Sequence, residues 1–141
     1  MDHSILEPAL AMVVLTFVVW VVMYVLRLGY ISTKKLDVQL LSSPEKMSAA
    51  LPERVNNAAN NLKNLFEVPV LFYVLCFYIA VAGISSEILV TLAWTYVSLR
   101  ALHSLVHCSV NIVKLRFTFY FVSCVVLISM LFLIYNGAQV G

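Results

Sequence analysis

Residues 8–26 read PALAMVVLTFVVWVVMYVL, nineteen consecutive positions without a charged side chain. At 1.5 Å of rise per residue, a helix of this length covers about 28 Å, close to the ~30 Å hydrocarbon core of a bilayer. Arg27 ends the run. The stretch therefore predicts a first membrane-spanning helix at about residues 5–29. It is too long for a secretory signal and has no basic residues before it, so we expect it to be retained.

The composition extends this prediction to the whole chain. Hydrophobic residues make up 62% of the 141 residues and charged residues only 11%, whereas soluble domains carry about a quarter charged residues. Soluble enzymes and nucleic-acid-binding domains are thereby excluded. Further apolar segments predict helices at about residues 53–82, 87–113 and 116–136, and a polar connection at 32–53 predicts a short helical turn after Pro44.

These segments predict one domain over residues 1–141, an all-α membrane protein built as a bundle of four transmembrane helices. The connections around residues 83–87 and 114–116 are very short. Short connections join helices that lie side by side, so we expect consecutive helices to be antiparallel neighbours.

The basic residues predict how the bundle is oriented. Eight of them fall on the two connections 1–2 and 3–4, and none on the opposite ends: Arg27, Lys34, Lys35, Lys46, Arg54, Lys63, Lys114 and Arg116. Cytoplasmic loops are enriched in Lys and Arg. We therefore expect a multi-pass protein with both connections in the cytoplasm and both termini outside or lumenal.

Polar side chains form a stripe along the third predicted helix. Arg100 lies near the middle of this span, where an isolated cation costs from ~2.5 kcal/mol upward, so it needs an anion, a carbonyl or water. The stripe recurs at spacings of 3, 4, 4 and 3 residues, within an arc of about 80°: Arg100, His103, His107, Asn111 and Lys114.

The second predicted helix carries a facing stripe, at spacings of 3, 4, 3 and 3: Arg54, Asn57, Asn61, Asn64 and Glu67. If helices 2 and 3 form a hairpin near residues 83–87, Glu67 and Arg100 lie at similar depths. We therefore predict an ion pair between them, within one subunit or across a subunit contact. The remaining polar groups are expected to line a cavity that opens to the cytoplasm.

The alternative, structural interpretation of these polar residues is that they only hold the helices together. Asn and His hydrogen-bond across membrane helices, and a buried ion pair can serve register alone. The three cysteines lie in apolar stretches without the spacing of a metal or redox motif, so we interpret them as packing residues and predict no metal site: Cys76, Cys108 and Cys124.

In this order, the polar residues resemble one family, the membrane-associated proteins in eicosanoid and glutathione metabolism (MAPEG), which includes the microsomal glutathione transferases. The resemblance covers about residues 53–135. It rests on Arg54-Val55, on Asn64-Leu65-Phe66-Glu67 followed by Pro69, on Arg100-Ala101-Leu102-His103-Ser104, and on Arg116.

The resemblance implies a homotrimer with glutathione bound as co-substrate between subunits at the cytoplasmic side. Arg116 would be the catalytic residue that stabilises the glutathione thiolate. A thiol with a pKa near 8.5 needs a fixed cation beside it to be an anion at pH 7, and an arginine supplies one because it stays protonated. The implied glutathione-binding residues are Arg27, Arg54, Asn64, Glu67, Arg100, His103 and His107.

Two positions depart from the eicosanoid-type pattern. Those enzymes have an Arg-Ala-His sequence just before the Asn-x-x-Glu motif, whereas this chain has Asn60-Asn61-Leu62-Lys63 there. His107 occupies a position where an aromatic residue is usual. These changes remove expected glutathione contacts.

Three functions are therefore compared. The leading one is a glutathione-dependent transferase or peroxidase that acts on lipophilic electrophiles. The second is a non-catalytic member that binds a lipid or a partner membrane protein. The third, a transporter or proton relay using His103 and His107, ranks last because the sequence shows neither an inverted repeat nor a pair of broken helices.

Overall fold

The computed structural model describes residues 4–140, with side chains to residue 137, and every regular element in this range is helical. The order along the chain is α1 (Leu6–Lys34), the 3₁₀-helix η1 (Val38–Leu41), α2 (Pro44–Ala50), α3 (Glu53–Leu65), α4 (Val68–Val81), α5 (Glu87–Cys108) and α6 (Val113–Val140). Four stretches are long and apolar enough to cross a membrane: Leu6–Lys34, Glu53–Val81, Glu87–Cys108 and Val113–Gly137. The four expected spans are confirmed, as is the helical turn after Pro44.

Two helices end later than the sequence predicted. α1 continues past residue 29 to Lys34 and stops where Lys35 adopts a left-handed conformation with φ of 50°. α6 runs past Asn136 and Gly137, which were expected to end it at about residue 136. A glycine in a helix costs only about 1 kcal/mol relative to alanine, so it does not end a helix by itself.

The third span ends earlier than predicted, at Cys108 instead of residue 113. The chain turns through Asn111, whose φ is 48°, a left-handed conformation that Asn tolerates better than most residues. Lys114 therefore lies on α6 and is exposed. The polar stripe expected on one helix is thus divided between α5, the turn and α6.

The second span is broken, although the sequence predicted a continuous helix over 53–82. α3 ends at Leu65 and α4 begins at Val68, with Glu67 between them at φ −97° and ψ −107°. Pro69 causes the break because it has no N–H to donate and its ring crowds the carbonyl four residues earlier. Because Glu67 lies in the break, it no longer continues the helix face that carries the asparagines of α3.

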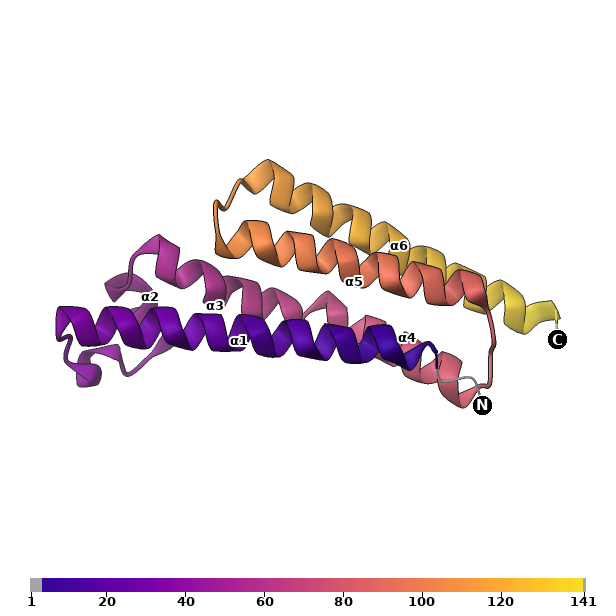
Figure 1. The fold of residues 1–141 in the computed structure, drawn as a ribbon, viewed down its shortest axis with the longest axis horizontal. Coiled ribbons are helices and arrows are strands. Elements are labelled where there is room, and N and C mark those ends of the chain that lie inside the picture. The colour runs from indigo at the N-terminus through magenta and orange to yellow at the C-terminus, as the bar shows by residue number, and fades with distance from the viewer. Residues whose placement is uncertain (1–3, 141) are drawn as a thin grey trace.

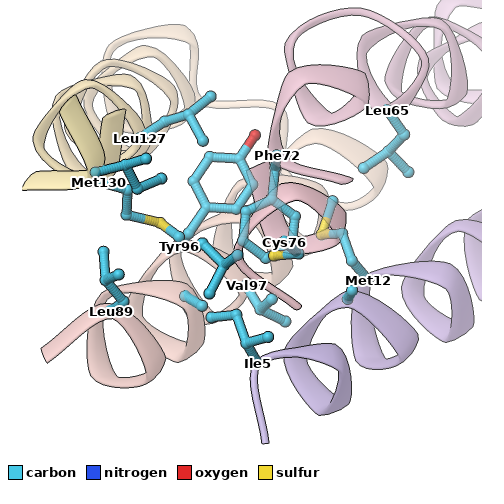
Figure 2. Packing of buried hydrophobic residues seen from close by; sticks show 14 of the residues in the cluster. Ile5, Met12, Leu65, Phe72, Cys76, Leu89, Tyr96, Val97, Leu127 and Met130 are labelled. Atoms are coloured by element: carbon cyan, nitrogen blue, oxygen red, sulfur yellow. The ribbon is translucent and has the colours of Figure 1, made fainter. Parts of the chain in front are cut away.

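The helices pack as two groups, with α1 along α3 and α4 and with α5 along α6 (Figure 1). Their shared core is apolar and centres on Tyr96, which lies between Phe72 and the α6 residues Leu127 and Met130 (Figure 2). The rings of Phe72 and Tyr96 stack with centroids 4.5 Å apart. Many large apolar side chains outside this core are exposed, including Val81 at 83%, as expected where lipid is the solvent.

Candidate functional site

Arg100 is the buried cation around which the site is built. It lies on α5 with no exposed surface, and its Nη2 donates a hydrogen bond of 3.3 Å to the backbone carbonyl of Asn64. Its guanidinium also lies over the Tyr120 ring, 5.4 Å from the centroid, a cation–π contact. Nε and Nη1 have no hydrogen-bond partner among the described residues.

The ion pair expected between Glu67 and Arg100 is wrong within one chain. Glu67 is exposed at the break between α3 and α4, and Arg100 bonds to a backbone carbonyl instead. The pairing across a subunit contact stays a prediction.

The break in the second span explains why that carbonyl can accept a bond from Arg100. In a continuous helix the Asn64 carbonyl would accept the N–H of Val68. Here the helical bond is replaced by weaker ones, from the Glu67 N–H at 3.4 Å and from the Phe66 N–H, and the carbonyl also accepts the bond from Arg100 Nη2. Pro69 thus supplies the acceptor that a cation in lipid requires.

His103 and His107 extend the buried polar group along α5. Both are 3% exposed, and their rings meet edge to face with centroids 5.6 Å apart. His103 Nδ1 is 3.0 Å from the backbone oxygen of Arg116. His103 Nε2 and His107 Nδ1 have no partner within residues 4–137.

Arg116 is half-buried at the start of α6, and Asn111 holds it in place. Arg116 Nη1 donates to Asn111 Oδ1. Asn111 Nδ2 donates in turn to Glu53 Oε1 and Asn57 Oδ1, each at 3.3 Å. The turn between α5 and α6 is thereby tied to the beginning of α3.

These side chains border a cavity of about 200 Å³, lined by Asn64, His103, Val113, Arg116, Phe117 and Tyr120. Arg116 provides a permanent charge at its wall, and Arg100 adds a second behind Asn64 and Tyr120. An enclosed cation and hydrogen-bond donors favour an anionic ligand. The site can therefore bind an anion and lower the energy of a negative charge that forms beside Arg116.

Five of the eight predicted site residues thus come together: Asn64, Arg100, His103, His107 and Arg116. The other three do not join them within one chain. Glu67 is exposed, Arg54 is exposed along a groove shared with Tyr30 and Lys34, and Arg27 lines a different cavity.

Two site residues were missed by the sequence analysis. Tyr120 follows Arg116 by four residues and so shares its helix face, a spacing that could have revealed it. Asn111 was expected among the polar groups of the stripe, but its bond to Arg116 was not, because that bond depends on the turn.

Other polar residues join helices, as the structural interpretation expected. Asn61 is fully buried, accepts a bond from the Ser104 hydroxyl at 3.3 Å and donates to Cys108 Sγ at 3.5 Å. These bonds connect α3 to α5. They are helix-joining contacts of the kind that the structural interpretation expected.

The model of the MAPEG family matches residues 5–136 of the chain. The chain belongs to the MAPEG family. Together with the four apolar helices, this makes it an integral, multi-pass membrane protein of that family. No curated protein and no solved structure matches the chain.

Proposed function

We propose that this MAPEG protein is a glutathione-dependent transferase or peroxidase that acts on lipophilic electrophiles. The observation that carries the proposal is the fixed position of Arg116, whose guanidinium is bonded to Asn111 at the wall of a cavity that also contains Asn64 and His103. A cation held in place before a thiol arrives stabilises the thiolate without reorganisation.

In this proposal Arg116 stabilises the sulfur anion, and Asn64 and His103 bind polar groups of the tripeptide. Arg100 raises the positive potential behind them and fixes the Asn64 backbone. The bound thiolate attacks an electrophilic carbon and forms a carbon–sulfur bond, with the displaced electrons leaving on the departing group. With a hydroperoxide, the thiolate attacks the terminal oxygen and the O–O bond breaks, which gives a sulfenic acid and an alkoxide that takes up a proton to leave as an alcohol. A second glutathione thiol then attacks the sulfenic sulfur, and the disulfide and water are released.

The proposal includes a homotrimer with sites completed between subunits. The cavity of about 200 Å³ is smaller than the ~300–1,000 Å³ of most small-molecule sites, so a neighbouring copy would supply the rest, and Arg54 and Glu67 would act from there. Consecutive spans would run antiparallel, with the basic connections in the cytoplasm and both termini outside or lumenal.

The test is thiolate formation on glutathione binding to the purified protein, followed by ultraviolet difference absorbance. Wild type should lower the pKa of the bound thiol by about 1–2 units, because a fixed cation favours the charged form. Arg116→Ala should abolish the thiolate signal, and Arg116→Lys should restore part of it. The matched control is Lys114→Ala, which removes an exposed charge two residues earlier on the same helix.

Absence of glutathione binding by wild type at millimolar concentration would refute the enzymatic proposal. The alternative is a non-catalytic member that binds a lipid or a partner membrane protein. The observation behind it is that Asn61, a buried polar residue, bonds to α5 and does not line the cavity. In that case Arg116→Ala would leave every glutathione readout unchanged.

A further inference from the structure

A second cavity lies apart from the site around Arg116. It has a volume of about 520 Å³ and lies between the end of α1, the η1–α2 segment and α3. Its wall combines two cations, Arg27 and Lys63, with serine hydroxyls and an apolar floor that includes Met23, Leu62 and Phe66. None of its lining residues borders the cavity at Arg116.

The positive charge of this cavity is only partly balanced. Arg27 Nε is buried and has no hydrogen-bond partner in the described part of the chain. Lys46 is not a lining residue, but its Nζ lies 3.5 Å from the Oγ of Ser42, which is one. The lining residues include no Asp or Glu. Glu45, next in the chain to the lining residue Pro44, has a pKa lowered chiefly by its own backbone N–H and the Ser43 hydroxyl, and also by the Lys63 charge. Two cations in the wall without a carboxylate favour an anionic ligand.

An apolar groove begins where the cationic cavity ends. It has a volume of about 560 Å³, lies between α1 and α4, and shares Leu62 and Phe66 with the cavity. Aromatic side chains line it farther along the span: Phe17, Trp20, Tyr73 and Phe77. From Val13 to Trp20 the groove follows α1 for about 10 Å at 1.5 Å per residue.

We infer that the two cavities together form a binding site for an anionic phospholipid of the surrounding bilayer. The phosphate would bind Arg27 and Lys63, with serine hydroxyls as further donors, and one acyl chain would lie in the aromatic groove. Charge complementarity selects this occupant, because a cationic recess that opens into an apolar groove matches an anionic headgroup on a hydrocarbon chain. The cationic cavity alone would also fit a free anion. The apolar groove alone would also fit any acyl chain of the bilayer.

Trp20 lines the apolar groove, so its fluorescence can report on the acyl chain bound there. Trp94, on α5, is removed by Trp94→Phe, so that Trp20 is the single tryptophan. The full-length protein is reconstituted in phosphatidylcholine vesicles, and a fixed fraction of the lipid is replaced by brominated phosphatidylglycerol, brominated phosphatidylcholine or brominated fatty acid. Bromine quenches tryptophan only at short range, so quenching of Trp20 measures which lipid occupies the groove.

Brominated phosphatidylglycerol should quench Trp20 more strongly than brominated phosphatidylcholine at equal fraction. Arg27→Gln and Lys63→Gln should each weaken the preference about fivefold, since each charge near the surface contributes that much to anionic lipid binding. Lys114→Gln is the matched control, because it removes an exposed basic residue that lines neither cavity. Arg27→Lys should retain most of the preference if charge dominates.

Three results would overturn the inference. Equal quenching by the phosphatidylglycerol and phosphatidylcholine probes would mean that the groove holds ordinary bilayer lipid. Preference for the brominated fatty acid over both would assign the cavity to a carboxylate ligand. Protection of Trp20 from every probe would mean that a second copy of the chain covers the groove. The assay contains no glutathione, so its outcome is independent of the proposed enzymatic function.

Discussion

Asn111 joins three parts of the candidate site, and its replacement tests how Arg116 is positioned. Its side chain accepts a bond from Arg116 and donates to Glu53 and Asn57, and its backbone has φ of 48°. Alanine and glycine both remove all three hydrogen bonds. They differ in the backbone, because glycine adopts the left-handed conformation without strain.

The magnitude follows from these contacts. A charge-assisted bond contributes about 1.5–3 kcal/mol and a neutral one about 0.5–1.5 kcal/mol. Asn111 is only half-buried and the two bonds it donates are long, so water replaces part of what is lost. We expect Asn111→Gly to lower the free energy of unfolding by about 1–3 kcal/mol.

Asn111→Ala should be less stable than Asn111→Gly by about 0.5–1 kcal/mol. A left-handed alanine costs roughly 1–2 kcal/mol, and the greater unfolded-state freedom of glycine offsets about 0.4–1 kcal/mol of this. Both variants should also lose most of the glutathione thiolate signal, because Arg116 is no longer held at the cavity wall.

The assay is unfolding in mixed micelles with increasing sodium dodecyl sulfate, alongside the thiolate absorbance. Val110→Ala is the matched control, since Val110 is an exposed residue in the same turn. Equal stability of the alanine and glycine variants would refute the backbone argument. A thiolate signal like that of wild type in Asn111→Gly would refute the role of Asn111 in positioning Arg116.

Two further predictions follow from the buried cation and the broken span. Arg100→Met should leave the free energy of unfolding unchanged or raise it by about 1–4 kcal/mol, because an incompletely paired buried charge is replaced by an apolar side chain, while glutathione binding weakens. Strong destabilisation measured in the same mixed-micelle titration would instead make Arg100 a structural residue. Pro69→Ala should allow the helix to continue, so amide hydrogen exchange at residues 66–68 should slow at least tenfold. Unchanged exchange there would mean that Pro69 does not cause the break.

The four spans were determined by the sequence alone. Membrane crossing depends on the length of an apolar run and the absence of charge, and both are local properties that residues 8–26 display without reference to the rest of the chain. The sequence alone also showed that Arg100 needs a partner, because that need follows from a single charge within an apolar span. So was the placement of Arg100, His103 and His107 on one helix face.

The partner itself was decided by the tertiary structure. Sequence spacing pairs side chains on ideal helices, so it suggested Glu67, but the bend at Pro69 rotates Glu67 outward and frees the Asn64 carbonyl. A backbone acceptor leaves no trace in a side-chain pattern. The link from Asn111 to Arg116 and the separate cavity at Arg27 likewise required the turn and the η1–α2 segment to be placed in space. Contacts between elements depend on the rotation and depth of each helix, and no single segment of the sequence encodes either.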